Sequence, residues 1–361
     1  MKPSGKLLAG LSAIALSSAA AASITTAWLR SFPIPLPHQA PDRPRLAPGP
    51  QRRVGVVVNP VKNRAEEAQE AVADALRRQG WEAARFYETT PEDAGTGPAR
   101  QALADGCDLI LALGGDGTVR AVAAEVAGTD AVLGIVPLGT GNLLARNTDL
   151  PFTDLHGCLD IALNGPPREI DLIKITAEIV DDDHRCDTPR TLTERFTVMG
   201  GAGFDAQIMT DTRDELKATM GWVAYAEAGL RNLVARRHSV KITLDGRTPV
   251  RRKTRAVIVA NTGDLTAGLR LAADSTVDDG RLEVILLTPR TLIDWAALSW
   301  QVLTRRKSIL PVIEHLHGTK VHVDFLHHSQ PMELDGDYLG HVRTFTAEVQ
   351  PGVLRMSSAT S

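Results

Sequence analysis

The sequence predicts an α/β part followed by a β-rich part. Over residues 54–165, short apolar runs alternate with stretches of helical composition, which is the pattern of a doubly wound parallel sheet. After residue 168 the pattern changes to a series of strand-like runs. The chain has 361 residues, enough for two hydrophobic cores. We therefore expect an α/β N-terminal domain and a β-rich, β-sandwich-like C-terminal domain.

In the first part, strands and helices follow each other along the chain. Residues 65–79 place their apolar side chains on one face of a helix, and Gly80 follows as a C-cap. Short apolar runs of the kind found in buried parallel strands come before and after this helix. The expected strands are residues 54–58, 109–113 and 132–136, and a second helix is expected over residues 118–126.

The second part consists mainly of apolar runs with strand-like composition. The expected strands are residues 170–177, 195–199, 239–244, 254–260, 282–287 and 320–325. Two stretches in this half have helical composition instead, residues 214–234 and 291–307.

Two glycine-rich turns follow buried strands of the first part. One is Gly114-Gly115-Asp116-Gly117-Thr118, and the other is Gly139-Thr140-Gly141-Asn142. Glycines at a strand-to-helix turn let backbone N–H groups approach an anion, and the helix N-terminus adds partial positive charge. Both turns would lie at the carboxyl edge of the sheet, where such sheets bind ligands. The sequence thus predicts a nucleotide-phosphate site.

Asp116 lies within the first turn, among these N–H groups. Its carboxylate could position Mg²⁺ on a triphosphate or accept a proton from an attacking hydroxyl. The residue type supports both roles and does not decide between them.

These motifs, together with Asn59-Pro60 and later landmarks, carry a family resemblance. Over about residues 53–355 the chain resembles the diacylglycerol kinase catalytic-domain family, which includes bacterial lipid kinases and sphingosine kinases, with NAD kinases as more distant relatives. The later landmarks are residues 201–206, 260–261, 278–282 and 335–337. The resemblance implies an α/β nucleotide-binding domain, a β-rich lipid-binding domain and a last segment that returns to the first domain.

The resemblance also implies which residues contact ATP. They are Asn59, Pro60, Thr89, Gly114, Gly115, Asp116, Gly117, Thr118, Arg120, Gly139, Thr140, Gly141 and Asn142. Arg120 stands where asparagine is common in the family, so it either adds a phosphate contact or faces solvent.

Two further sites rest on the same resemblance. Asp337 stands at the position of the general base, usually a glutamate in the family, which makes its side chain one methylene shorter. Asp116 and Asp337 are therefore the expected catalytic residues. Asp279, with backbone carbonyls near Thr276 and Arg281, matches a structural Mg²⁺ site.

Composition and charge narrow the possible partners. The formal net charge is −3 and no aromatic-interleaved basic surface is visible, so we expect no nucleic-acid partner. The three cysteines, Cys107, Cys158 and Cys186, are odd in number and widely spaced. They indicate neither a disulfide framework nor a zinc site. The sequence does not reveal the oligomeric state.

The N-terminus is apolar over residues 7–29, a segment that contains no charged side chain. This segment fits either an uncleaved membrane anchor or a cleaved secretory signal. The arginines that follow it favour an anchor with the catalytic part in the cytoplasm. The expected organisation is an anchor over residues 1–30, a Pro-rich linker over 31–52, an ATP-binding domain over 53–166, a lipid-binding domain over 167–345 and a C-terminal segment over 346–361.

Taken together, these features predict an ATP-dependent lipid kinase with ATP and Mg²⁺ as cofactors and the membrane surface as a partner. Diacylglycerol is the leading acceptor, and phosphatidic acid would be the product. Two alternatives stay open. One is a membrane-tethered nucleotide-binding protein of the same fold without kinase turnover, motivated by Asp337. The other is a kinase for a sphingosine-like or another lipid.

Overall fold

The structure is a computed structural model that describes residues 51–180, 189–203, 237–262, 275–291, 294 and 312–359. The chain divides into two compact units, Met1–Arg43 and Pro44–Ser361, and every element below belongs to the second. The expected anchor over residues 1–30, most of the Pro-rich linker, the expected helix 214–234 and nearly all of the expected helix 291–307 lie outside the described residues.

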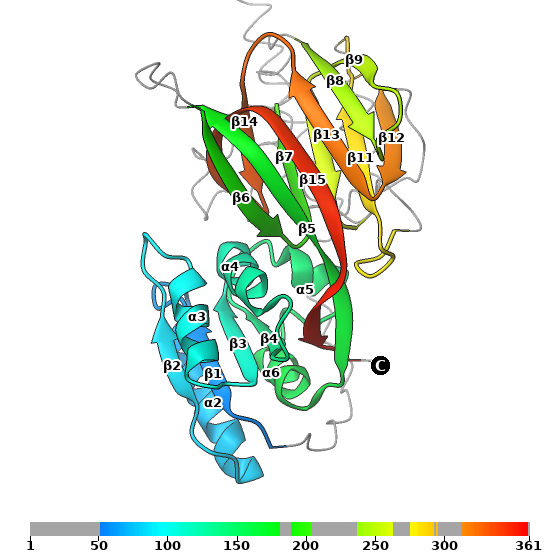
Figure 1. Ribbon diagram of the computed structural model, residues 1–361. Helices are drawn as coiled ribbons and strands as arrows, with labels where there is room; N and C mark the ends of the chain where they lie inside the picture. The colour runs from blue at the N-terminus through cyan, green and yellow to red at the C-terminus, as the bar shows by residue number, and fades with distance from the viewer. Residues whose placement is uncertain are drawn as a thin grey trace, which may run out of the picture. The chain divides into compact units, whose positions relative to one another are not determined.

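Four parallel strands form the α/β part, in the spatial order β4-β3-β1-β2 (Figure 1). The strands are β1 (Val54–Val58), β2 (Arg85–Glu88), β3 (Leu109–Gly114) and β4 (Val132–Pro137). The helices are α2 (Ala65–Gln79), α3 (Thr96–Ala104), α4 (Asp116–Val126), α5 (Leu143–Asn147) and α6 (Leu155–Asn164). Strands β1, β3 and β4 are buried along their whole length, except for the last residue of β4. Such burial is expected for a parallel sheet that is covered on both faces.

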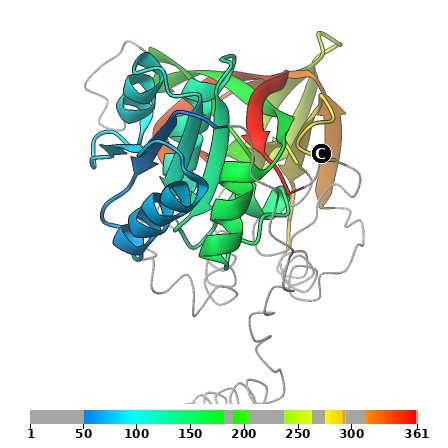
Figure 2. The same ribbon diagram turned by 90° about the horizontal axis from the view of Figure 1, so that it is seen from below.

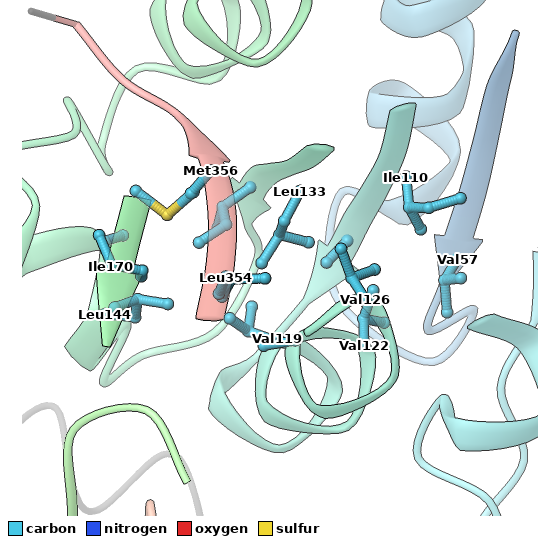
Figure 3. Packing of buried hydrophobic residues seen from close by; sticks show 14 of the residues in the cluster. Val57, Ile110, Val119, Val122, Val126, Leu133, Leu144, Ile170, Leu354 and Met356 are labelled. Atoms are coloured by element: carbon cyan, nitrogen blue, oxygen red, sulfur yellow. The ribbon is translucent and has the colours of Figure 1, made fainter. Parts of the chain in front are cut away.

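Helices cover both faces of these four strands (Figure 2). On one face, α2 and α6 pack over apolar side chains such as Val56 and Leu111. On the other face, α3, α4 and α5 pack over Val57, Ile110 and Leu133 (Figure 3). This is the α/β arrangement that the alternating sequence pattern predicts.

The rest of the described chain is a mostly antiparallel β structure with its own buried apolar cluster. Its strands are β5 (Pro167–Val180), β6 (Arg190–Phe196), β7 (Met199–Ala202), β8 (His238–Leu244), β9 (Val250–Thr254), β10 (Ala256–Ala260), β11 (Leu282–Leu287), β12 (Ile313–Gly318), β13 (Lys320–Phe325), β14 (Gln330–Leu334) and β15 (Asp337–Ser357). The expected fold class is thus confirmed.

Two runs predicted as single strands are each divided in the structure. The run 195–199 is broken at Thr197, whose N–H and hydroxyl both donate to the Asp335 carboxylate. The run 254–260 is broken at Arg255, beside a Thr254 hydroxyl that donates to the carbonyls of Ala256 and Leu287. In both places side-chain hydrogen bonds interrupt the ladder.

The last strand, β15, connects the two parts. It pairs with β5 along most of its length, and near its end Met356 lies opposite Leu133 of β4 in parallel register. Leu354 and Met356 join the apolar cluster of the α/β part (Figure 3). Consequently one strand belongs to both cores and fixes the β-rich part against the α/β part.

The expectation of a cell-membrane protein with a single N-terminal anchor is corrected here. Among the described residues no helix is long and apolar enough to cross a bilayer. The longest helix of that part of the chain, α2, has 15 residues, whereas a span requires about 20 mostly apolar ones. The expected anchor segment, residues 7–29, lies outside the described residues.

Candidate active site

The first glycine turn connects β3 directly to α4. Gly115 is the N-cap of the helix, its backbone is extended, and no side chain caps the helix N-terminus. Gly114 packs so closely that an added Cβ would lie 2.6 Å from the Thr118 side chain. The turn therefore presents backbone N–H groups and a helix N-terminus without a competing side-chain cap, which suits a phosphate.

The second glycine turn follows β4 and lies directly against the first. The N–H of Leu138 donates to the carbonyl of Gly114 at 2.7 Å. A Cβ added to Gly139 would lie 2.8 Å from the Cα of Gly115, so only glycine permits this approach. Asn142 closes the turn, with φ of 49° and its side-chain amide donating to the Gly139 carbonyl at 2.8 Å.

Asp116 holds the two turns together. Its Oδ2 accepts the N–H of Asn142 at 2.9 Å, and its Oδ1 accepts the N–H of Leu143 at 2.6 Å. Burial raises the pKa of the Asp116 carboxyl, and the nearby Asp335 charge raises it further, while these two N–H bonds act in the opposite direction. Both carboxylate oxygens therefore already bind the backbone of the second turn.

Asn59, Pro60 and Thr89 lie at the same edge of the sheet, after the ends of β1 and β2. The N–H of Asn59 donates to the carbonyl of Leu113 at 3.0 Å, and the N–H of Thr89 donates to the carbonyl of Val58 at 2.9 Å. The structure thus brings these predicted ATP contacts to the edge that carries both glycine turns.

Lys62 is a residue of this edge that the sequence reasoning missed. Its N–H donates to the Asn59 carbonyl at 3.2 Å, which turns the chain back. A Cβ added to Gly115 would lie 3.6 Å from Lys62 Cε and 3.8 Å from its Nζ. An ammonium group therefore lies over the first glycine turn, where it would favour phosphate. The sequence signal was a basic residue three positions after Asn59.

Asp337 reaches this site from the β-rich part, at the tip of a β hairpin. Asp335 and Gly336 form the two-residue turn between β14 and β15, with φ of 46° and 90°, as a type I′ turn requires. Leu334 and Asp337 are the last pair of the hairpin. A Cβ on Gly117 would lie 2.8 Å from Asp337 Oδ2, so the carboxylate lies against the first turn of α4.

Asp335 fixes this hairpin in place. Its buried carboxylate accepts four hydrogen bonds, from the N–H and hydroxyl of Thr197 and from the N–H groups of Val198 and Met199. Complete burial raises the pKa of Asp335, and the four donors oppose this rise. Two donors face each oxygen, which is the pattern that an ionised carboxylate accepts.

The predicted metal residues lie in the loop before β11. Asp279 accepts the N–H of Thr276 at 3.1 Å and that of Arg281 at 2.9 Å. The N–H of Gly280, the residue between Asp279 and Arg281, donates to the buried Asp171 carboxylate at 2.7 Å. The described residues contain no group of three or more His, Cys, Asp or Glu side chains that could hold a metal. A site built from one carboxylate and backbone carbonyls stays a prediction.

Hydrogen bonds connect this loop to the Asp337 hairpin. The Asn261 amide donates to the carbonyls of Asp171 and Thr197, at 2.8 and 3.0 Å. Thr197 in turn donates to Asp335. The loop and the hairpin therefore share one buried polar network.

This geometry defines a class of protein. The site combines two glycine turns, which contact each other directly, with a carboxylate from the second part of the fold. This arrangement suits a phosphotransferase that binds a nucleoside triphosphate. Residues 53–175 match the diacylglycerol kinase catalytic domain, and residues 198–358 match the YegS C-terminal NAD kinase beta sandwich-like domain. The chain belongs to the diacylglycerol kinase-like family of lipid kinases.

Individual relatives agree with this membership. The chain is 28% identical over 297 residues to a diacylglycerol kinase of Bacillus subtilis, covering 80% of this chain and 91% of the relative. It is 31% identical over 240 residues to a protein named "Probable lipid kinase YegS-like" from Pseudomonas syringae, covering 66% of this chain and 72% of the relative. Membership of a kinase family indicates that the chain uses ATP.

A solved structure shows the same fold. The crystal structure of a diacylglycerol kinase from Bacillus anthracis superposes with a TM-score of 0.63 at 19% identity, covering 85% of this chain and 96% of that one. At this identity the likeness supports the fold alone.

Proposed function

We propose that this protein is an ATP-dependent kinase that phosphorylates a hydroxyl of a membrane lipid, with diacylglycerol as the acceptor and phosphatidic acid as the product. The observation that carries the proposal is the meeting of the Asp337 carboxylate with the first turn of α4. This contact supports the proposal, because a carboxylate there could accept a proton beside the turn that is suited to the phosphates. The Bacillus subtilis relative, named a diacylglycerol kinase and matched over 91% of its length, supports the choice of acceptor.

In the proposed reaction, the two glycine turns and Lys62 hold the triphosphate. The lipid hydroxyl oxygen attacks the γ-phosphorus while its proton passes to the Asp337 carboxylate. The new P–O bond forms as the bond between the γ-phosphorus and the bridging oxygen breaks, so ADP leaves with the electron pair of that bond. Mg²⁺, when bound to the triphosphate, would neutralise part of its charge.

We assign the proton-accepting role to Asp337 rather than to Asp116. Both oxygens of Asp116 accept backbone N–H groups of the second turn, whereas the Asp337 side chain is 47% exposed. An acceptor must reach the proton that it removes. Asp116 therefore organises the phosphate site, and Asp337 faces the acceptor.

The buried hydrogen bonds between the Asp279 loop and the hairpin support a structural role for this loop. Its link through Asp171, Asn261 and Thr197 ends at the hairpin that carries Asp337. An Mg²⁺ ion held by Asp279 and backbone carbonyls would offset the charge that Asp279 adds near the buried Asp171 carboxylate.

An acceptor survey tests the proposal. Full-length protein is incubated with ATP, Mg²⁺ and mixed micelles that contain diacylglycerol, sphingosine or no acceptor, and ADP release is measured. We expect release that depends on diacylglycerol. Release with sphingosine alone would keep the reaction and change the substrate. ATP binding without release for any lipid would favour a nucleotide-binding protein without turnover.

A further inference from the structure

Arg120 and Asp337 form an ion pair between the two parts of the fold. The Nη2 of Arg120, on α4, donates to Asp337 Oδ2 at 2.9 Å, although 217 positions separate the two residues in the sequence. The arginine side chain is 12% exposed and the aspartate side chain 47%. The guanidinium is thus mostly buried, whereas the carboxylate keeps an open side.

The guanidinium makes one close hydrogen bond, to Asp337, and leaves part of its donor capacity unused. Its buried Nε–H has no hydrogen-bond partner among the described residues. Its second carboxylate neighbour, Glu194 on β6, lies 3.9 Å from Nη1, beyond hydrogen-bond distance. Unsatisfied buried donors are rare in folded proteins, and they concentrate where function opposes stability.

The surroundings fix the carboxylate from two further sides. Gly117 has no side chain, and an added Cβ would lie 2.8 Å from Asp337 Oδ2. Behind Asp337, the Asp335 turn is held by four hydrogen bonds. An aspartate side chain is one methylene shorter than a glutamate, so the position of its carboxylate against α4 depends on the backbone and on the partner that holds it.

From this arrangement we infer that Arg120 is a positioning residue that holds the short Asp337 carboxylate at the first turn of α4, in the orientation that proton transfer requires. Arg120 acts through Asp337 and does not bind the nucleotide. The inference rests on the proposed function. It replaces the sequence-based expectation that Arg120 contacts ATP or faces solvent.

Steady-state kinetics of full-length variants test this role. Arg120→Gln removes the charge but keeps a long polar side chain, and Arg120→Lys keeps the charge without the planar fork. We expect Arg120→Gln to lower kcat at least about 10-fold, with the KM for ATP changed less than about 2-fold, and Arg120→Lys to recover part of the loss. The control is Arg100→Gln. Arg100, on α3, pairs on an exposed face with Glu125 of α4, the helix that also carries Arg120.

The double variant separates positioning from nucleotide binding. If Arg120 acts through Asp337, then Arg120→Gln causes no further loss in an Asp337→Asn background, because the effects of residues acting as a unit are not additive. A raised KM for ATP that persists in this background would overturn the inference. So would unchanged or increased kcat in Arg120→Gln, the latter indicating an inhibitory contact. No lipid-dependent turnover in the unaltered protein would overturn the proposed function and the inference together.

Discussion

Replacing Asp116 with asparagine tests how the phosphate site is built. The carboxylate accepts one N–H with each oxygen, from Asn142 and Leu143. An asparagine retains one oxygen, and its amide nitrogen then faces the other N–H. We take about 1.5–3 kcal/mol for the charge-assisted bond that is lost and about 0.5–1 kcal/mol for the weakening of the other. The expected loss in unfolding free energy is therefore about 2–4 kcal/mol.

The same loss predicts the effect on ATP binding. If the second turn must re-form when ATP binds, then about 2–4 kcal/mol corresponds to a 30-fold to 700-fold weaker affinity, at tenfold for each 1.4 kcal/mol. Titration calorimetry measures the affinity, and urea unfolding measures the stability. Asp245→Asn is a control in the β-rich part, where a single oxygen of Asp245, Oδ1, accepts the N–H groups of Thr319 and Lys320.

Two results would refute this reasoning. Asp116→Asn with nearly unchanged stability but lost ATP binding would mean that Asp116 contacts the nucleotide or its metal rather than the second turn. Equal losses of ATP affinity in Asp116→Asn and Asp245→Asn would mean that global destabilisation, not the turn, explains the effect.

Three further predictions follow from individual contacts. Asp335→Asn leaves buried N–H groups unpaired, and we expect urea unfolding to show a loss of about 2–4 kcal/mol; a loss below about 1 kcal/mol would contradict the assigned role. Gly117→Ala improves helix propensity by up to about 1 kcal/mol but displaces Asp337, so turnover should fall while the Tm stays or rises; a parallel fall of both would be unexpected. N–H donors, that of Thr319 first, lower the pKa of Asp245 below its unfolded value of about 3.9. Its stabilisation is therefore complete above that pH and is lost as the pH falls through the folded-state pKa. The stability difference between the unaltered protein and Asp245→Asn should shrink as the pH falls below that unfolded value, and a constant difference would argue against this.

Local sequence patterns were sufficient for β1, α2, β3 and β4 of the α/β part. The parallel strands are buried apolar runs, and the helix 65–79 has one apolar face and a glycine C-cap, so the structure has β1, α2, β3 and β4 close to the expected bounds. The glycine turns were also predictable, because two of them follow buried strands that end at the same edge of a parallel sheet. Their direct contact depends on how neighbouring strands end, and the structure supplied it.

Other features depend on residues far apart in the chain. No local pattern connects Arg120 with Asp337, which lie 217 positions apart. From the sequence, Asp335 was predicted only as part of the landmark 335–337, and its four hydrogen bonds arise because β7 begins beside the hairpin. Lys62 was missed because its ammonium reaches Gly115 only through the turn after Asn59. The divided strands have the same origin, in side chains that compete with the ladder.

Transfer of labelled γ-phosphate to the lipid tests the central claim most directly. Full-length protein is incubated with γ-labelled ATP, Mg²⁺ and diacylglycerol in mixed micelles, beside Asp337→Asn and the control Asp324→Asn, an aspartate of β13. We predict label in phosphatidic acid with the unaltered protein and with Asp324→Asn, and a rate at least about 100-fold lower with Asp337→Asn, the range for loss of a general base. An unchanged rate in Asp337→Asn, or bound ATP whose label never enters a lipid, would contradict the account.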